Sequence, residues 1–136
     1  MDRVALVVDD SALIRNEIRR FLQKVGFRVV TASNGLEGLV RVAEVAPALI
    51  VTGLMMPRLN GGEFIREIRH RSVKREVTIV AIAGIRGRNV PSPRAGADHV
   101  IFKGVDLVEQ LQLALGLGQP SVRTKPPAKP TARIPD

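Results

Sequence analysis

Hydrophobic and polar residues divide most of this chain into two alternating kinds of segment. Short, nearly unbroken apolar runs are typical of strands buried on both faces, as in a parallel sheet. Such runs lie at residues 4–8, 27–31, 48–52, 77–82 and 99–102. Between them, apolar residues recur every three or four positions, which is the spacing of an amphipathic helix. These segments are 12–25, 35–46, 63–71 and 106–115. The alternation predicts an α/β fold of three layers, a five-stranded parallel sheet between helices.

Residues that begin and end helices lie at the boundaries of these segments. Ser11 is a favourable N-cap for the first predicted helix, and Gly26 is a favourable stop after it. Residues 33–35 predict a turn before the second helix. That helix ends ahead of Pro47, because a residue before proline avoids helical geometry.

Residues 84–95 interrupt the alternation. They contain two glycines and two prolines. Proline removes a backbone donor, and each glycine costs about 1 kcal/mol relative to alanine inside a helix. We therefore expect the helix between the fourth and fifth strands to be degenerate or missing, with at most a short turn near 92–95.

The last residues differ in composition from the rest. Residues 119–136 hold five of the nine prolines and four basic side chains, with little that is apolar. Such a composition is typical of a flexible or polyproline-like segment. We expect one domain over residues 1–117 and a Pro/Lys/Arg-rich tail or linker over 118–136.

Composition excludes several classes of protein. The chain has no cysteine, which excludes disulfides, thiolate metal sites and a cysteine nucleophile. Aromatic residues make up 3% of the chain, with no Trp or Tyr, which disfavours a base-stacking surface. No apolar run reaches the ~18 residues of a membrane helix, and the N-terminus lacks a signal-peptide pattern. We expect a cytoplasmic protein without a membrane span.

The net charge of +8 narrows the class of partner. A basic balance indicates nucleic acid, acidic lipid or an acidic protein. Here the arginines are spread over several segments instead of being packed into one. This favours a solvated basic surface over a nucleic-acid interface.

Charged residues follow two of the predicted strands. Asp9 and Asp10 come directly after the first strand, and Lys103 follows the fifth. In open α/β sheets, ligands bind at the carboxyl ends of the strands. These side chains are therefore candidates for a common site.

Three further sequence features accompany the acidic pair and Lys103. Residues 54–57 read Leu-Met-Met-Pro, Asn60 and Gly61 follow, and Gly-Ala-Asp at 96–98 precedes the fifth strand. Together with the acidic pair and Lys103, they resemble the receiver domain of bacterial two-component response regulators, the CheY-like fold. The resemblance covers residues 3–116 and implies the strand order 2-1-3-4-5.

The resemblance also implies a mechanism. In such receivers an aspartate that closes the third strand takes a phosphoryl group from a histidine kinase, and an acidic pair binds Mg²⁺. A Ser or Thr after the fourth strand and a lysine after the fifth contact the phosphate. An aromatic side chain on the fifth strand then changes rotamer.

This sequence keeps the acidic pair and the lysine but departs from the family at the other positions. Gly53 stands at the acceptor position, and Ala83 stands at the Ser/Thr position. Val100 replaces the aromatic residue, and Gly104 replaces the proline that usually follows the lysine. Thr52 precedes the acceptor position and should point to the other side of the strand.

The requirements of phosphoryl transfer indicate how these substitutions affect function. Phosphoryl transfer needs a nucleophilic oxygen in line with the phosphorus, and Gly53 offers none beyond its backbone. We therefore expect no catalytic residue, no enzymatic activity and no required cofactor. Asp9 and Asp10 leave room for weak Mg²⁺ binding, and Lys103 is expected to pair with one of them. A simpler interpretation is that both aspartates only accept hydrogen bonds from the next helix.

The sequence thus predicts a pseudo-receiver, a receiver-like signalling module that works without phosphorylation by binding another protein. The expected partner is acidic and belongs to a bacterial two-component, polarity or motility pathway. The predicted partner surface comprises Arg86, Arg88, Arg94, Val100 and Phe102, together with the last helix. The degenerate pocket comprises Asp9, Asp10, Gly53, Ala83 and Lys103.

Three alternatives remain open at this stage. A conventional phosphorelay regulator could use another acceptor, such as Asp10. A basic, nucleic-acid-associated regulator would bind with a steep salt dependence, although the chain contains no helix-turn-helix segment. A flavodoxin-like binder of a small molecule would need a glycine-rich phosphate loop after the first strand, which is absent.

Overall fold

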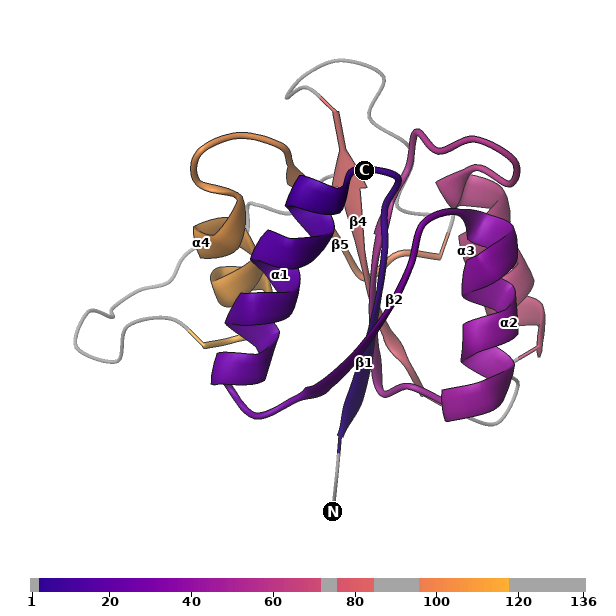
Figure 1. The fold of residues 1–136 in the computed structure, drawn as a ribbon, viewed down its shortest axis with the longest axis horizontal. Helices are drawn as coiled ribbons and strands as arrows, with labels where there is room; N and C mark the ends of the chain where they lie inside the picture. Colours follow the sequence, from indigo (N-terminus) through magenta and orange to yellow (C-terminus); the bar gives the residue numbers. More distant parts are fainter. Residues whose placement is uncertain (1–2, 72–75, 85–95, 118–136) are drawn as a thin grey trace.

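One parallel sheet forms the centre of the molecule. The computed structural model describes residues 3–71, 76–84 and 96–117. The strands are β1 (Val4–Val8), β2 (Arg28–Ala32), β3 (Leu49–Gly53), β4 (Thr78–Ala83) and β5 (His99–Phe102). They pair in parallel in the order β2-β1-β3-β4-β5 (Figure 1), which confirms the predicted order.

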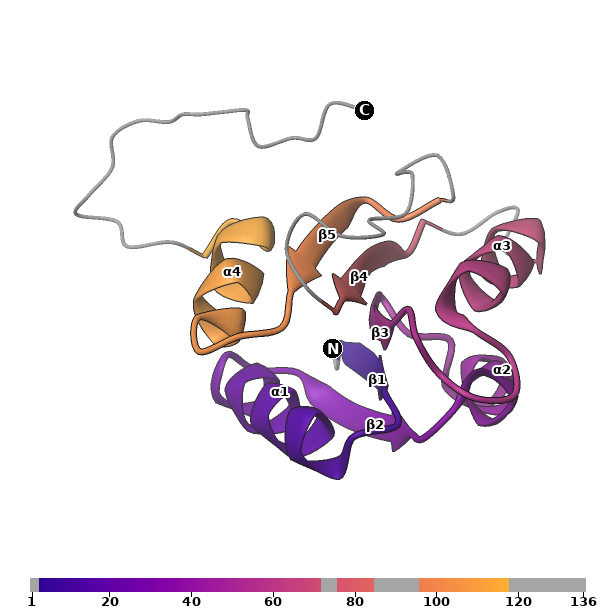
Figure 2. The ribbon, with the colours of Figure 1, turned by 90° about the horizontal axis from the view of Figure 1, so that it is seen from above.

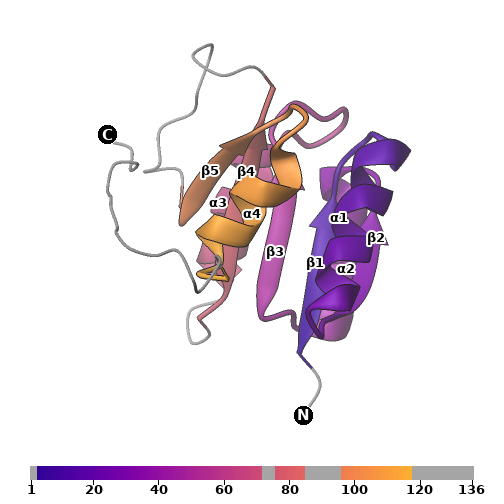
Figure 3. The same ribbon diagram turned by 90° about the vertical axis from the view of Figure 1, so that its left-hand side faces the viewer.

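Helices cover both faces of this sheet. The four helices of the described residues are α1 (Ala12–Lys24), α2 (Gly35–Val45), α3 (Gly61–Arg71) and α4 (Leu107–Ala114). Viewed from above, α1 and α4 lie on one face of the sheet and α2 and α3 on the other (Figure 2). Figure 3 shows α1 and α4 on the same side from a third direction. The predicted three-layer architecture is confirmed.

Several element boundaries differ from the predicted ones. Strands β2, β3 and β4 begin and end one residue later than the apolar runs suggested. The register explains this for β2, because Arg28 pairs opposite Val4 at the start of β1. Helix α3 begins at Gly61, two residues early, since the Asn60 side chain accepts a hydrogen bond from the Glu63 amide (3.0 Å) and caps the first turn.

Two predicted features cannot be compared with the structure. The described residues contain no helix between β4 and β5, but residues 85–95, where a degenerate helix was expected, lie outside the described ranges. The tail at 118–136 also lies outside them. None of the helices in the described ranges has the length and apolar content of a bilayer-spanning segment.

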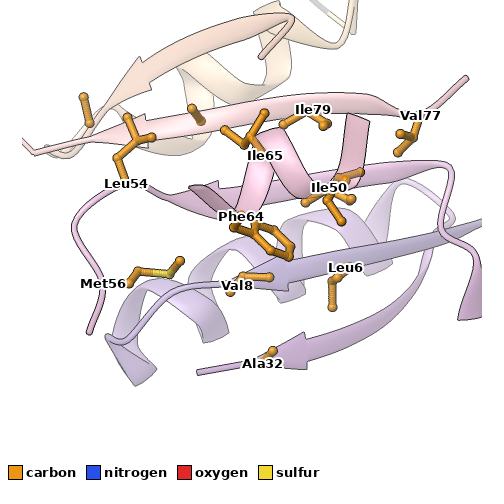
Figure 4. Packing of buried hydrophobic residues seen from close by; sticks show 13 residues of the cluster. Leu6, Val8, Ala32, Ile50, Leu54, Met56, Phe64, Ile65, Val77 and Ile79 are labelled. Atoms are coloured by element: carbon orange, nitrogen blue, oxygen red, sulfur yellow. The ribbon is translucent and has the colours of Figure 1, made fainter. Parts of the chain in front are cut away.

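The alternation of side chains along each strand creates a core on both sides of the sheet. Leu6, Val8 and Ile50 face α2 and α3, and they pack with Phe64 and Ile65 of α3 (Figure 4). The intervening strand residues face α1 and α4. All strands but β2 and β5 are therefore buried on both faces, which is why their sequences read as continuous apolar runs.

Arg69 of α3 joins the far edge of the sheet to its helix layer. Its guanidinium donates to the carbonyl oxygens of Gly96 (2.9 Å) and Val77 (2.9 Å) and to the Asp98 carboxylate (3.0 Å). Asp98 also accepts a hydrogen bond from the Ile79 amide (2.8 Å). These bonds position the start of β5, and so the strand that leads to Lys103.

Candidate functional site

The predicted pocket residues do meet at one edge of the sheet. Asp9 follows β1, Gly53 ends β3, Ala83 ends β4 and Lys103 follows β5. The Lys103 amide donates to the carbonyl oxygen of Ala83 (3.1 Å), which continues the ladder past the strand. All four positions therefore lie at the carboxyl ends of the strands, toward the top of Figure 1.

Asp9 is the buried member of the acidic pair. It is 1% exposed, and its Oδ1 accepts a hydrogen bond from the Ser11 amide (2.9 Å). Ser11 in turn caps α1, because its hydroxyl oxygen accepts from the Ile14 amide (3.2 Å). The Arg15 guanidinium donates to the Asp9 carbonyl oxygen (2.7 Å). The start of α1 thus holds Asp9 by side chain and by backbone.

The carboxylate of Asp9 extends over Gly53. A Cβ atom placed on Gly53 would lie 2.5 Å from Asp9 Oδ2 and 3.2 Å from its Cγ. Oδ2 is buried and has no hydrogen-bond partner in the described residues. The volume that an acceptor side chain would need at position 53 is therefore taken up by Asp9.

The environment of Asp9 changes its acidity. Burial raises the pKa of the Asp9 carboxyl above its ordinary value of 3.8, and the nearby Asp10 carboxylate also raises it. The hydrogen bond from the Ser11 amide and the charge of Lys103 oppose that rise in pKa. The ionised form of Asp9 is consequently less favourable in the folded chain than in the unfolded chain.

This raised pKa predicts a pH-dependent stability. A folded-state pKa above the unfolded value gives stability that is present below pH 3.8 and is lost as the pH rises through the folded pKa. Asp9→Asn removes the titration while keeping Oδ1 as an acceptor for Ser11. We expect the variant to have a higher urea midpoint than the natural chain at pH 7, with the difference shrinking toward pH 4. A variant less stable than the natural chain at pH 7 would contradict this explanation.

Lys103 does not form the predicted ion pair. In the described ranges no ion pair within 4.0 Å joins it to Asp9 or Asp10. The Asp9 carboxylate is directed to the Ser11 amide and to Gly53 instead, while Asp10 is exposed to solvent. Lys103 acts on Asp9 only as a nearby charge that lowers its pKa.

Ala83 and Thr52 offer no free hydroxyl group to the pocket. Ala83 is buried and carries no hydroxyl group. Thr52 is also buried, and its hydroxyl donates to the Gly53 carbonyl oxygen (2.9 Å). Neither position therefore presents a free hydroxyl where a receiver would contact a phosphate.

The acidic pair does not fit a complete Mg²⁺ site. Mg²⁺ requires near-octahedral oxygen coordination. One Asp9 oxygen is occupied by the Ser11 amide and the other faces Gly53, so only Asp10 presents its carboxylate to solvent. The described residues contain no group of three or more metal-ligating side chains.

The predicted partner surface is only partly described. Val100 and Phe102 are partly buried and pack against the core on the α2 and α3 side. The Gln110 side chain bonds both the amide (2.9 Å) and the carbonyl oxygen (2.8 Å) of Phe102, which ties β5 to α4. No sequence signal had pointed to Gln110. Residues 86, 88 and 94 lie outside the described ranges.

Comparison with known proteins identifies the family and the fold. Residues 5–115 match the response regulator receiver domain. Among solved structures, the response regulator TrrA from Thermotoga maritima, in complex with Mg²⁺-BeF, is 28% identical with a TM-score of 0.72. That match covers 85% of this chain and 98% of TrrA.

Curated relatives are longer than this chain. The response regulator MprA of Mycobacterium leprae is 34% identical over 121 residues, which cover 89% of this chain and 52% of MprA. The probable transcriptional regulator ycf27 of Porphyra purpurea is 36% identical over 98 residues, 72% of this chain and 40% of that protein. The chain thus spans about half the length of these relatives.

Proposed function

The chain belongs to the response regulator receiver domain family, and on that premise we propose that it is a pseudo-receiver, which signals without being phosphorylated. The observation that supports this most directly is the pairing of Gly53 with Asp9. Position 53 has no side-chain oxygen, and the Asp9 carboxylate lies where such a side chain would begin. An in-line attack on phosphorus therefore has no nucleophile at this position.

The surrounding groups support the same proposal. A transferred phosphoryl group carries charge on its equatorial oxygens, which must be stabilised by donors and cations. Ala83 supplies no donor, and Lys103 is the one cation of the predicted pocket. We propose that the chain requires no cofactor and that Mg²⁺ binds at Asp9 and Asp10 only weakly.

The proposed activity is binding to another protein. In this proposal the partner surface includes the segment from residue 84 to 106 and helix α4, and the partner is acidic because the chain is basic. The partner is expected in a two-component, polarity or motility pathway. The activity of any longer protein that contains this chain belongs to the same proposal.

Intact-mass spectrometry after incubation with acetyl phosphate and Mg²⁺ tests the proposal. We expect no phosphoryl adduct on the natural chain, because neither Gly53 nor Ala83 can take part in the transfer. The TrrA receiver, incubated in parallel, serves as a control for the reagent. A stoichiometric, hydroxylamine-sensitive adduct on the natural chain would refute the proposal, and its loss in Asp10→Asn would identify the acceptor.

A further inference from the structure

Positive charge is not distributed evenly over the helices. Helix α1 carries four basic side chains, Arg15, Arg19, Arg20 and Lys24, and one acidic side chain, Glu17. None of the four forms an ion pair within 4.0 Å in the described part of the chain. Helix α1 is therefore the main source of uncompensated positive charge among the helices.

Three of the four arginines of α2 and α3 pair with carboxylates in the described residues, and Arg66 is the exception. In α2, Arg41 pairs with Glu37 (3.9 Å) and Glu44 (3.0 Å). In α3, Arg71 pairs with Glu67 (3.5 Å), and Arg69 pairs with Asp98 as described above. Pairing of this kind reduces the field that a distant acidic partner experiences.

The exposed charges of α1 gather at the end opposite the pocket. Arg20 and Lys24 are exposed and lie one turn apart in the last half of α1. Because α1 runs back along the sheet, this end of the helix lies at the amino ends of the strands, at the lower edge of Figure 1. Arg3, which precedes β1 at the same edge, is also exposed. We refer to Arg3, Arg20 and Lys24 as the basic amino edge.

Two features give this edge a defined surface. The Arg3 guanidinium lies over the ring of Phe27, with 4.6 Å to the centroid, which restricts its position. Val25 follows Lys24 and is 42% exposed, so an apolar contact lies next to the cations. An ordered guanidinium beside an exposed apolar side chain is suited to binding a carboxylate-bearing chain.

We propose that the basic amino edge binds an acidic polypeptide segment of a partner protein. The edge has three cations, and none of them forms an ion pair within 4.0 Å with another described residue. So few charges match a short run of carboxylates, whereas a DNA duplex would call for about six to ten phosphate contacts. Phe27 is 9% exposed and is covered by Arg3, so it offers no stacking platform for single-stranded nucleic acid. This binding lies at the end of α1 opposite the pocket, and it does not depend on whether the chain is phosphorylated.

Fluorescence anisotropy with a labelled oligoglutamate peptide tests this proposal. Two variants change the net charge equally, Arg20→Glu/Lys24→Glu at the basic amino edge and Arg58→Glu/Arg66→Glu on the loop before α3 and on α3. All four side chains are exposed, so both variants should fold, which circular dichroism would check. We expect the first variant to weaken binding about tenfold and the second about twofold or less.

Each other outcome argues against the proposal. If the peptide did not bind the natural chain, the proposal would be refuted. Equal weakening of binding in both variants would mean that the charge acts only diffusely. An oligothymidylate of matched charge that binds more tightly than the peptide, and loses binding in the Arg20→Glu/Lys24→Glu variant, would assign the edge to nucleic acid instead. The acetyl phosphate experiment does not affect either result, so the two proposals can fail separately.

Discussion

Replacing Gly53 with aspartate is expected to create a phosphoryl acceptor in this chain. Acetyl phosphate and Mg²⁺ should then give a hydroxylamine-sensitive adduct on Gly53→Asp, detected by intact mass, while the natural chain gives none. The new carboxylate would stand at the end of β3, at the same edge as Asp10 and Lys103. It would supply the nucleophilic oxygen that phosphoryl transfer requires.

The substitution requires Asp9 to move. The atom closest to the new Cβ is Asp9 Oδ2, the far end of a side chain that can change rotamer. With Asp9 displaced, three carboxylates would be available to a cation. We expect Mg²⁺ to bind the natural chain more weakly than about 0.1 mM and Gly53→Asp more tightly, as isothermal titration would measure.

Gly53→Ala is the matched control. It introduces the same Cβ and the same displacement of Asp9, but it adds no oxygen. If Gly53→Ala also gained an adduct, the phosphoryl group would be carried by Asp9 or Asp10 and the role assigned to position 53 would be wrong. A folded Gly53→Asp chain that stays unmodified would show that the glycine is not the only obstacle to transfer, and that another departure, such as the missing hydroxyl at Ala83, also prevents it.

Phe64→Ala should be the most destabilising single change in the core. Phe64 is fully buried on α3, and its ring packs against α2, where a Cβ on Gly38 would lie 2.9 Å from ring atom Cε1. In Figure 4 the ring lies near Val8, the residue before Asp9. Truncation leaves a cavity between α2, α3 and the sheet, so we expect a loss of about 3–5 kcal/mol in the free energy of unfolding.

Urea unfolding measures this loss. Phe64→Leu is the control, because it keeps most of the apolar volume and should cost about 1.5 kcal/mol or less. A loss below about 1 kcal/mol for Phe64→Ala would show that the neighbouring side chains close the cavity completely, contrary to the tight packing around Gly38.

The sheet was predictable because its signals are local and repeated. The apolar run at 99–102 coincides with β5, and the helical periodicity of 12–25 differs from α1 by one residue. The start of α3 was missed because a side-chain cap at Asn60 outweighed the loop-like composition of residues 53–62. Such a cap depends on one hydrogen bond, which no periodicity reveals.

The candidate site was predictable only in part. Strand ends placed Asp9, Gly53, Ala83 and Lys103 at one edge, and the structure confirms that placement. The direction of the Asp9 side chain was not predictable, because it depends on the Ser11 amide and on the space above Gly53. The prediction of an ion pair between Lys103 and the acidic pair was wrong for the same reason. Two residues that lie along one edge of a sheet do not thereby have a carboxylate oxygen directed at the cation.

The hydrogen bonds of Arg69 have a consequence for the thermodynamics of association. An edge strand such as β5 usually frays first, and a partner that binds a frayed strand loses affinity by ordering it. Here the residues before β5 are held to α3 and to the start of β4 by one guanidinium and the Asp98 carboxylate. Fraying at this end of β5 would have to break these bonds together. A protein that docks beside β5 would therefore meet a pre-ordered strand, and little of its binding energy would be spent on immobilising it.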